Sequence, residues 1–171
     1  AYDASKCTTV PEGCMVRYVK CANEAELLMK FLTYWEEHYP DVITGWNVRL
    51  FDIPYLINRI KRILNEEWAK KLSPWNIVNY RQIGVKGKSL DTFEIYGVQQ
   101  LDYMDLFQKF GYVYGPQESY SLNHICHVIL GERKLSYEEY GSLHNLYEQD
   151  HQKFIDLSLI HISEPTRLLS I

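Results

Sequence analysis

Apolar residues recur along the first part of the chain at strand spacing and at helix spacing in turn. Alternation over 15–21 predicts a strand, and β-branched and aromatic residues over 41–48 predict another. Between them a helix is expected to open at Asn23, with Glu26 three residues on as in a capping box, and to close at Pro40. Its predicted buried face consists of Leu27, Leu28, Phe31, Leu32 and Trp35.

A second amphipathic helix follows Asp52. Its apolar positions fall on one face at the 3.6-residue period, and Pro54 suits the first helical position. These apolar positions are Ile53, Leu56, Ile57, Ile60, Ile63 and Leu64. Asp52 is therefore expected where a strand ends and a helix begins.

The rest of the pattern predicts a hairpin and further helices. Strands are expected over 80–85, 90–96 and 99–107, a helix over 121–130 and mixed helical structure over 137–156, with a polar stretch over 66–79. Asp102 and Asp105 alternate with apolar neighbours on the third of these strands, and we expect both to be solvated at the surface, although one could face a site. The class is α/β.

Composition and charge narrow the class of protein. The chain has 171 residues, 46% of them hydrophobic, and a formal net charge of −4. Its apolar runs fall short of the roughly 20 residues that span a bilayer, so we expect no membrane association and a cytoplasmic, intracellular location. A DNA-binding protein is usually more basic, but a site that collects carboxylates for metal ions offsets such a bias.

Asp52 is the main candidate for chemistry, since folding does not require a charge at an apolar strand-to-helix junction. In α/β folds, ligands and metals collect at this edge of the sheet. The alternative is a carboxylate that only stabilises the helix dipole, worth about 0.3–1 kcal/mol.

Residues 47–55 match the pattern Asn-x-x-x-Phe-Asp-x-x-Tyr and thereby resemble the second exonuclease motif of family B DNA polymerases. Four further segments of the sequence are similar to polymerases of T-even-type bacteriophages, and they occur in the same order along the chain. They lie at 44–47, 55–61, 101–107 and 119–122, and the resemblance covers residues 24–156. It implies a ribonuclease H-like exonuclease fold, a mixed sheet flanked by helices, with a β-hairpin insertion.

The resemblance implies two-metal chemistry. The family's domain is a proofreading 3′–5′ exonuclease of a replicative DNA polymerase, in which two Mg²⁺ (or Mn²⁺) ions are held by acids from three motifs. In this sequence only the second motif is found, so Asp52 is the expected catalytic and metal-binding residue. We therefore expect residues 1–156 to be a partial, incomplete exonuclease domain, inactive by itself.

The same resemblance implies residues that contact DNA. Asn47 is expected to hold the substrate end or the geometry of the motif, while Phe51 and Tyr55 are either core residues or base-stacking contacts. Gly87 suits the tight turn of the predicted hairpin, which in phage polymerases helps to separate primer from template. Its neighbours Lys86 and Lys88 would point into solvent or toward phosphate.

The partners implied are a single-stranded 3′ end, primer–template DNA, the rest of the polymerase chain and a sliding clamp. Two other functions stay open. One is a stand-alone proofreading exonuclease, against which the hairpin insertion and the block at 119–122 argue. The other is a non-catalytic single-stranded DNA-binding module, against which the intact Asp52 argues.

The C-terminal segment has a different character. Residues 157–167 read Leu-Ser-Leu-Ile-His-Ile-Ser-Glu-Pro-Thr-Arg, which resembles the translation of a transposase mosaic-end sequencing adapter without a mismatch. We therefore expect residues 157–171 to be a non-native, adapter-derived tail and leave them out of fold reasoning. The alternative is a natural C-terminal helix.

Overall fold

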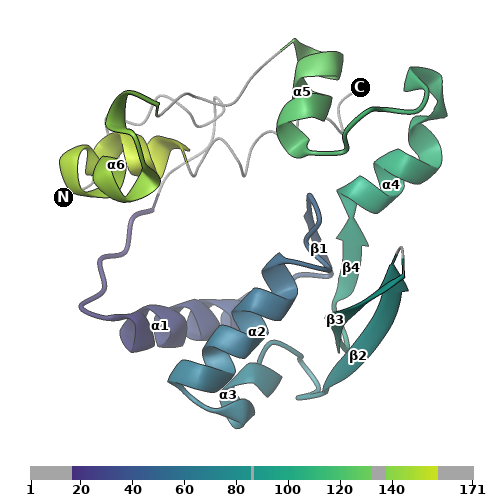
Figure 1. The fold of residues 1–171 in the computed structure, drawn as a ribbon. Coiled ribbons are helices and arrows are strands. Elements are labelled where there is room, and N and C mark those ends of the chain that lie inside the picture. The colour runs from purple at the N-terminus through teal and green to yellow at the C-terminus, as the bar shows by residue number, and fades with distance from the viewer. Residues whose placement is uncertain (1–16, 86, 132–137, 158–171) are drawn as a thin grey trace. The chain divides into compact units, whose positions relative to one another are not determined.

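A computed structural model describes residues 17–85, 87–131 and 138–157 of the chain (Figure 1). These residues belong to two compact units. One is formed by Lys20–Gly115, and the other by Ala1–Val19 together with Pro116–Ile171. Each unit is considered by itself. The adapter-like residues 158–171 and Lys86 lie outside the described residues, and Leu157 ends a helical segment.

The unit Lys20–Gly115 carries most of the regular structure. In chain order its elements are α1 (Glu24–Glu37), β1 (Val42–Gly45), α2 (Asp52–Ile63), α3 (Glu66–Lys70), β2 (Val78–Val85), β3 (Lys88–Ile95), β4 (Gln99–Asp102), α4 (Tyr103–Phe110) and the 3₁₀ helix η2 (Gly111–Tyr114). The mixed α/β class is confirmed.

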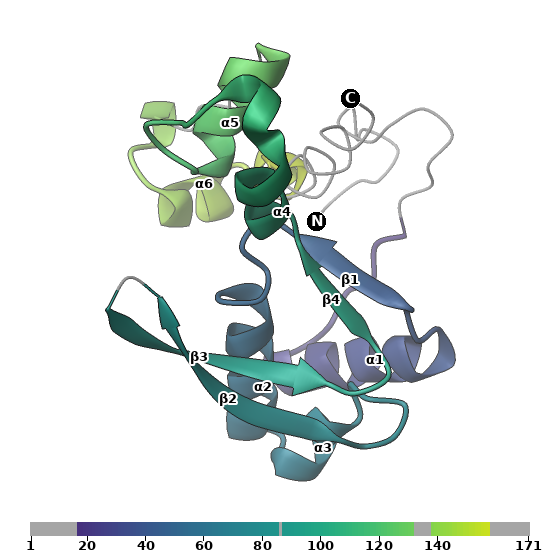
Figure 2. The ribbon, with the colours of Figure 1, turned by 90° about the vertical axis from the view of Figure 1, so that its right-hand side faces the viewer.

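The strands pair in two ways. Within the described residues, β1 and β4 form a parallel pair with Gly45 opposite Asp102, and β2 and β3 form an antiparallel hairpin (Figure 2). The parallel register brings the ends of β1 and β4 together, so the segments that follow them start side by side. These segments are the turn 46–51 and α4.

One hydrophobic core joins the helices to the strands of this unit. Figures 1 and 2 show α1, α2 and α3 gathered on one side of the strands. Since α2 supplies Ile53, Ile57 and Ile60 to this core, its apolar stripe sets the position of its N-terminus. The core consists of Leu28, Leu32, Val48, Ile53, Ile57, Ile60, Ala69, Leu72, Phe93, Ile95 and Val98.

The start of α1 agrees with the sequence pattern. Asn23 accepts a hydrogen bond from the Glu26 N–H at 2.9 Å, while the Glu26 carboxylate accepts one from the Ala22 N–H at 2.7 Å. In a regular capping box the Glu side chain accepts the N–H of the N-cap residue itself. Here Glu26 accepts the N–H of Ala22, the residue before the N-cap. The predicted buried face was wrong at Leu27, which is exposed, because Leu28 and Leu32 point to the core instead.

Several other predictions were wrong in part. Residues 17–21 form no regular element, and a short helix, α3, lies within the polar stretch 66–79. The predicted strand 99–107 ends at Asp102, where α4 begins, because the Asp102 side chain caps that helix. α2 begins two residues before Pro54, so this proline stands third in the helix, still within the first turn, where its missing N–H costs no bond.

Among the described residues of the second unit, the regular elements are helices. Ser121 caps α5 (Leu122–Leu130), and Gly131 ends it in the left-handed conformation at φ 71°. The 3₁₀ helix η3 (Glu138–Tyr140), α6 (Leu143–Gln149) and a helical segment over 151–157 follow. The predictions for 121–130 and, where residues are described, 137–156 are confirmed.

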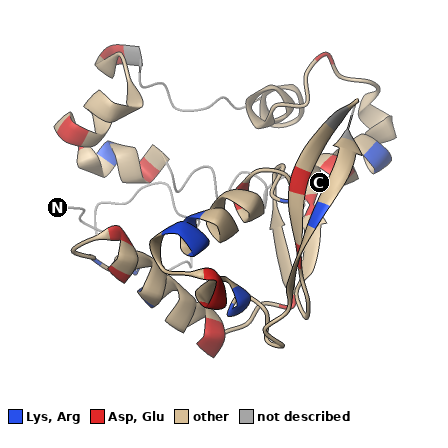
Figure 3. Ribbon diagram, turned by 60° about the horizontal axis from the view of Figure 1, so that its bottom comes forward, with Lys and Arg blue, Asp and Glu red and all other residues tan. Residues whose placement is uncertain are grey.

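Basic and acidic residues are interspersed along the ribbon in Figure 3. Arg59 of α2 forms an ion pair with Glu24 of α1, and Lys71 forms one with Glu36 of α1 at 3.1 Å. These pairs connect helices rather than mark out a basic surface. Among the described residues, no helix combines the length and the apolar composition needed to span a membrane.

Candidate functional site

Asp52 is the first residue of α2 and follows directly on the turn 46–51. The turn is closed by its own backbone, since the Asn47 carbonyl accepts the N–H groups of Leu50 at 3.3 Å and Phe51 at 3.1 Å. The Val48 carbonyl accepts the Ile53 N–H at 3.0 Å and so joins the turn to the helix. Asp52 is thereby held between a closed turn and a packed helix.

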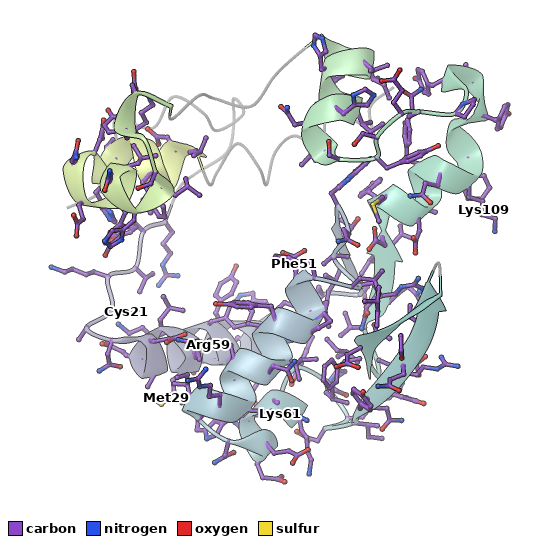
Figure 4. All side chains as sticks on the ribbon, viewed as in Figure 1. Cys21, Met29, Phe51, Arg59, Lys61 and Lys109 are labelled. Atoms are coloured by element: carbon purple, nitrogen blue, oxygen red, sulfur yellow. The ribbon has the colours of Figure 1, made fainter. Side chains whose placement is uncertain are left out.

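The burial of α2 decides which side chains of the motif face solvent. Ile53, Ile57 and Ile60 enter the core, which turns the opposite face outward. Phe51 is 66% exposed and Tyr55 is 63% exposed. Figure 4 shows Phe51 at the N-terminal end of α2. Of the two alternatives for these rings, the core position is wrong, and both rings are available for contact with a ligand.

The environment of Asp52 disfavours its negative charge. Partial loss of hydration raises the pKa of the Asp52 carboxyl above its usual value, a hydrogen bond from its own backbone N–H lowers it, and the nearby charge of Asp102 raises it. The residue as a whole remains exposed, so only part of the carboxyl group is withdrawn from water. A nearby cation would relieve this unfavourable charge.

Asp102 differs most from its sequence prediction. It is 6% exposed rather than solvated at the surface. Its Oδ1 accepts the N–H groups of Asn47 and Met104, and its Oδ2 accepts the N–H of Arg49, each at 3.0 Å. The carboxylate therefore joins the turn before Asp52 to the start of α4. The signal in the sequence was the capping pattern Asp-x-x-Asp of residues 102–105, with an acid at the third helical position.

Arg49 connects the same turn to two other elements. Its carbonyl accepts a hydrogen bond from Thr92 Oγ1 of β3 at 3.0 Å, and its Nη2 lies 2.9 Å from Asp105 Oδ2 of α4. Asp105 is partly exposed, as expected. Arg49 Nε and Asn47 Oδ1 are buried without a hydrogen-bond partner among the described residues. Asn47 also has a φ of 63°, so this asparagine serves the geometry of the turn.

The predicted DNA contacts fall into two groups. Asn47, Phe51, Asp52 and Tyr55 share the turn and the first helical turn of α2. Gly87 lies at the tip of the hairpin with φ 78°, next to Lys88, the first residue of β3. Lys86 is outside the described residues. Away from its tip, the hairpin contacts the C-terminal part of α2: Lys61 Nζ of α2 lies 5.4 Å from the centre of the Phe93 ring of β3.

The residues present could hold a metal ion only in part. Within the described residues, no group of three or more His, Cys, Asp or Glu side chains stands together. Three backbone N–H groups occupy most acceptor positions of the buried Asp102 carboxylate, which makes the exposed Asp52 the better placed of the two for an ion. A pocket of about 640 Å³ is lined by Asp41, Arg49, Glu94 and Gln100, among others, but Asp52 does not line it.

Residues 2–125 match the family model described as "DNA polymerase family B, exonuclease domain". This range covers most of the chain and includes the turn, α2, the hairpin and Asp102. The chain belongs to this family.

Individual relatives agree with this assignment. This chain is 40% identical over 145 residues to the "DNA-directed DNA polymerase" of Escherichia phage RB69. The match covers 85% of this chain and 16% of that protein. The chain is 36% identical over 155 residues to that of Enterobacteria phage T4, covering 90% and 17%. The "DNA polymerase delta catalytic subunit" of Schizosaccharomyces pombe is 34% identical over 119 residues, covering 66% and 10%. The chain thus spans about a sixth of the length of its phage relatives.

Proposed function

We propose that this chain is a segment of a proofreading 3′–5′ exonuclease within a replicative DNA polymerase. The observation that carries the proposal is the Asp52 carboxylate at the start of α2, flanked by the exposed rings of Phe51 and Tyr55. A carboxylate of raised pKa beside two flat apolar surfaces suits a cation and an unpaired nucleotide together. Membership in the family B exonuclease domain supports the same reading.

Each residue of the site then has a defined role. The Asp52 carboxylate would hold a Mg²⁺ or Mn²⁺ ion. Phe51 and Tyr55 stack against bases at the single-stranded 3′ end, which keeps the terminal phosphodiester near Asp52. Asn47 maintains the turn through its backbone and its left-handed conformation. Two such ions would supply Lewis-acid stabilisation of the developing charge on the phosphodiester and a more acidic attacking water.

The proposal extends to the wider protein through its relatives. They are named as DNA-directed DNA polymerases and polymerase delta catalytic subunits, which favours a polymerase over a stand-alone exonuclease. We infer a ribonuclease H-like sheet, primer–template DNA as substrate, the rest of the polymerase chain and a sliding clamp as partners, and action in the host cytoplasm. The exposed carboxylate favours catalysis over a non-catalytic DNA-binding module. Residues 157–171 remain proposed as an adapter-derived tail, with 1–156 as the partial domain.

The test is Asp52→Ala in the polymerase that contains this chain. We expect the rate of digestion of a single-stranded primer to fall by at least about 10²-fold while nucleotide incorporation stays unchanged, because a metal ligand is lost at little cost to folding. The matched control is Glu66→Ala, which removes an exposed acid from the first residue of α3. An Asp52→Ala enzyme that digests primer at the original rate would refute the proposal.

A further inference from the structure

The buried carboxylate of Asp102 bonds to the turn that precedes Asp52. We propose that Asp102 is a positioning residue for exonuclease activity: it fixes the turn 46–51 and, through it, the place of the Asp52 carboxylate. This inference rests on the proposed function, because it assigns Asp52 the role of metal ligand. Asp102 itself touches neither ion nor substrate in this scheme.

The bonds and the burial of Asp102 favour a structural role over metal binding. Its two oxygens accept three backbone N–H groups, those of Asn47, Arg49 and Met104, all at 3.0 Å. At 6% exposure it has little contact with water. A buried carboxylate that accepts several backbone N–H groups is fixed in its orientation by them. It is therefore suited to fix the backbone around it.

The turn needs such an acceptor because its backbone leaves regular pairing at Gly45. That residue is the last of β1 and stands opposite Asp102 in the parallel register. The chain then folds back tightly: a Cβ added at Gly45 would lie 3.2 Å from the Cβ of Val48. Asn47 follows with a positive φ. The N–H groups of Asn47 and Arg49 therefore leave the strand ladder, and the Asp102 carboxylate accepts both.

A continuous series of bonds leads from Asp102 to Asp52. Asp102 holds the Asn47 N–H, and the Asn47 carbonyl accepts the N–H of Phe51, the residue before Asp52. The neighbouring Val48 carbonyl accepts the N–H of Ile53, the residue after Asp52. Both flanks of Asp52 thus depend on the part of the turn that Asp102 holds. A displacement of about 1 Å at a catalytic group can cost about 10²-fold in rate.

The experiment uses two substitutions of Asp102 in the polymerase that contains this chain. Asp102→Asn places an amide NH₂ against a backbone N–H. Asp102→Ser keeps a cap for the Met104 N–H of α4 but is too short to reach the turn. For both we expect the exonuclease rate to fall roughly 10–100-fold and the Mg²⁺ concentration for half-maximal rate to rise, with polymerisation unchanged.

Asp105→Asn is the matched control. It neutralises an aspartate three residues further along, in the first turn of α4, and Asp105 reaches the turn only through the partly exposed Arg49 side chain. We expect its exonuclease rate to stay within about twofold of the original, as an exposed ion pair contributes little. An equal loss in Asp105→Asn would show that general charge around α4, rather than the backbone bonds of Asp102, controls the rate, and would overturn the inference.

A double-mutant cycle with Asp52→Asn separates positioning from general damage. If Asp102 acts through Asp52, then Asp102→Asn has little further effect on the residual rate of Asp52→Asn. If Asp102→Asn lowers the rate of Asp52→Asn by the same factor as it lowers the original rate, Asp102 does not act through Asp52, and the inference is overturned. Unfolding of both Asp102 variants at assay temperature would likewise show a purely structural role and overturn it. Full activity of Asp102→Asn, together with an inactive Asp52→Asn, would refute the role of Asp102 but leave the proposed function intact. An active Asp52→Asn would refute the proposed function instead.

Discussion

Gly97 lies directly against the ring of Pro74. A Cβ added to Gly97 would stand 2.5 Å from Pro74 Cγ and 3.0 Å from Pro74 Cδ, and Gly97 has a φ of 88°. This contact joins the turn between β3 and β4 to the segment after α3. The Ser73 hydroxyl supports the same junction by donating to the Tyr96 carbonyl at 2.6 Å. The β3–β4 connection, and with it the start of β4, thus depends on the absence of a side chain.

Gly97→Ala should therefore destabilise the protein beyond the cost of its backbone conformation. A positive φ costs an alanine about 1–2 kcal/mol, and the clash with the rigid proline ring adds to that. Gly87→Ala is the matched control, because Gly87 has a φ of 78° and open space around its Cβ position. Urea unfolding of the two variants compares the free energies directly. Equal losses would show that the ring contact at Gly97 contributes nothing.

The pair between Glu24 of α1 and Arg59 of α2 predicts a pH dependence of stability. The hydrogen bond from Arg59 lowers the pKa of Glu24 below its ordinary 4.5. A carboxyl whose pKa is lower in the folded state stabilises the fold above its unfolded pKa, and this contribution disappears as pH falls through the folded pKa. Glu24→Gln should hence lower the melting temperature at pH 7, and this effect should fade as pH falls below 4.5 and through the lowered folded pKa of Glu24. A difference that persists at low pH would place its origin in packing.

The hairpin gives a prediction about strand transfer. Gly87→Val introduces a β-branched residue at a positive φ, which should distort the tip between β2 and β3. Under the proposed function, the polymerase should then make more errors on duplex primers yet still digest single strands. The measurement is misincorporation on primer–template DNA beside digestion of a single-stranded oligonucleotide. An equal fall in single-strand digestion would contradict a separate role for the hairpin.

The 171-residue chain alone should show no Mg²⁺-dependent nuclease activity. Among its described residues, no three or more His, Cys, Asp or Glu side chains stand together, and a single carboxylate holds Mg²⁺ weakly. Without a second ion the attacking water is not activated at neutral pH. Incubation of the purified chain with a labelled oligonucleotide checks this. Degradation that requires Mg²⁺ and disappears in Asp52→Ala would mean that residues described above as structural supply the other ligands.

The sequence by itself determined the elements whose signals are local. The 3.6-residue stripe of α2, the caps Asn23 and Ser121 and the glycine of the hairpin turn all depend on neighbours within a few residues. The family and the place of Asp52 could be predicted for the same reason, because the motif is contiguous. Strand ends were less accessible: 99–107 was predicted as one strand because its alternation of apolar and polar residues continues past Asp102 into the first residues of α4.

Only the tertiary structure decided the role of Asp102. Its carboxylate bonds to residues more than fifty positions away along the chain, and only the parallel register of β1 and β4 brings them together. Exposure of Phe51 and Tyr55 likewise followed from which face of α2 enters the core. Periodicity shows that a helix has an apolar face, but burial of a single aspartate depends on backbone donors that distant segments bring to it.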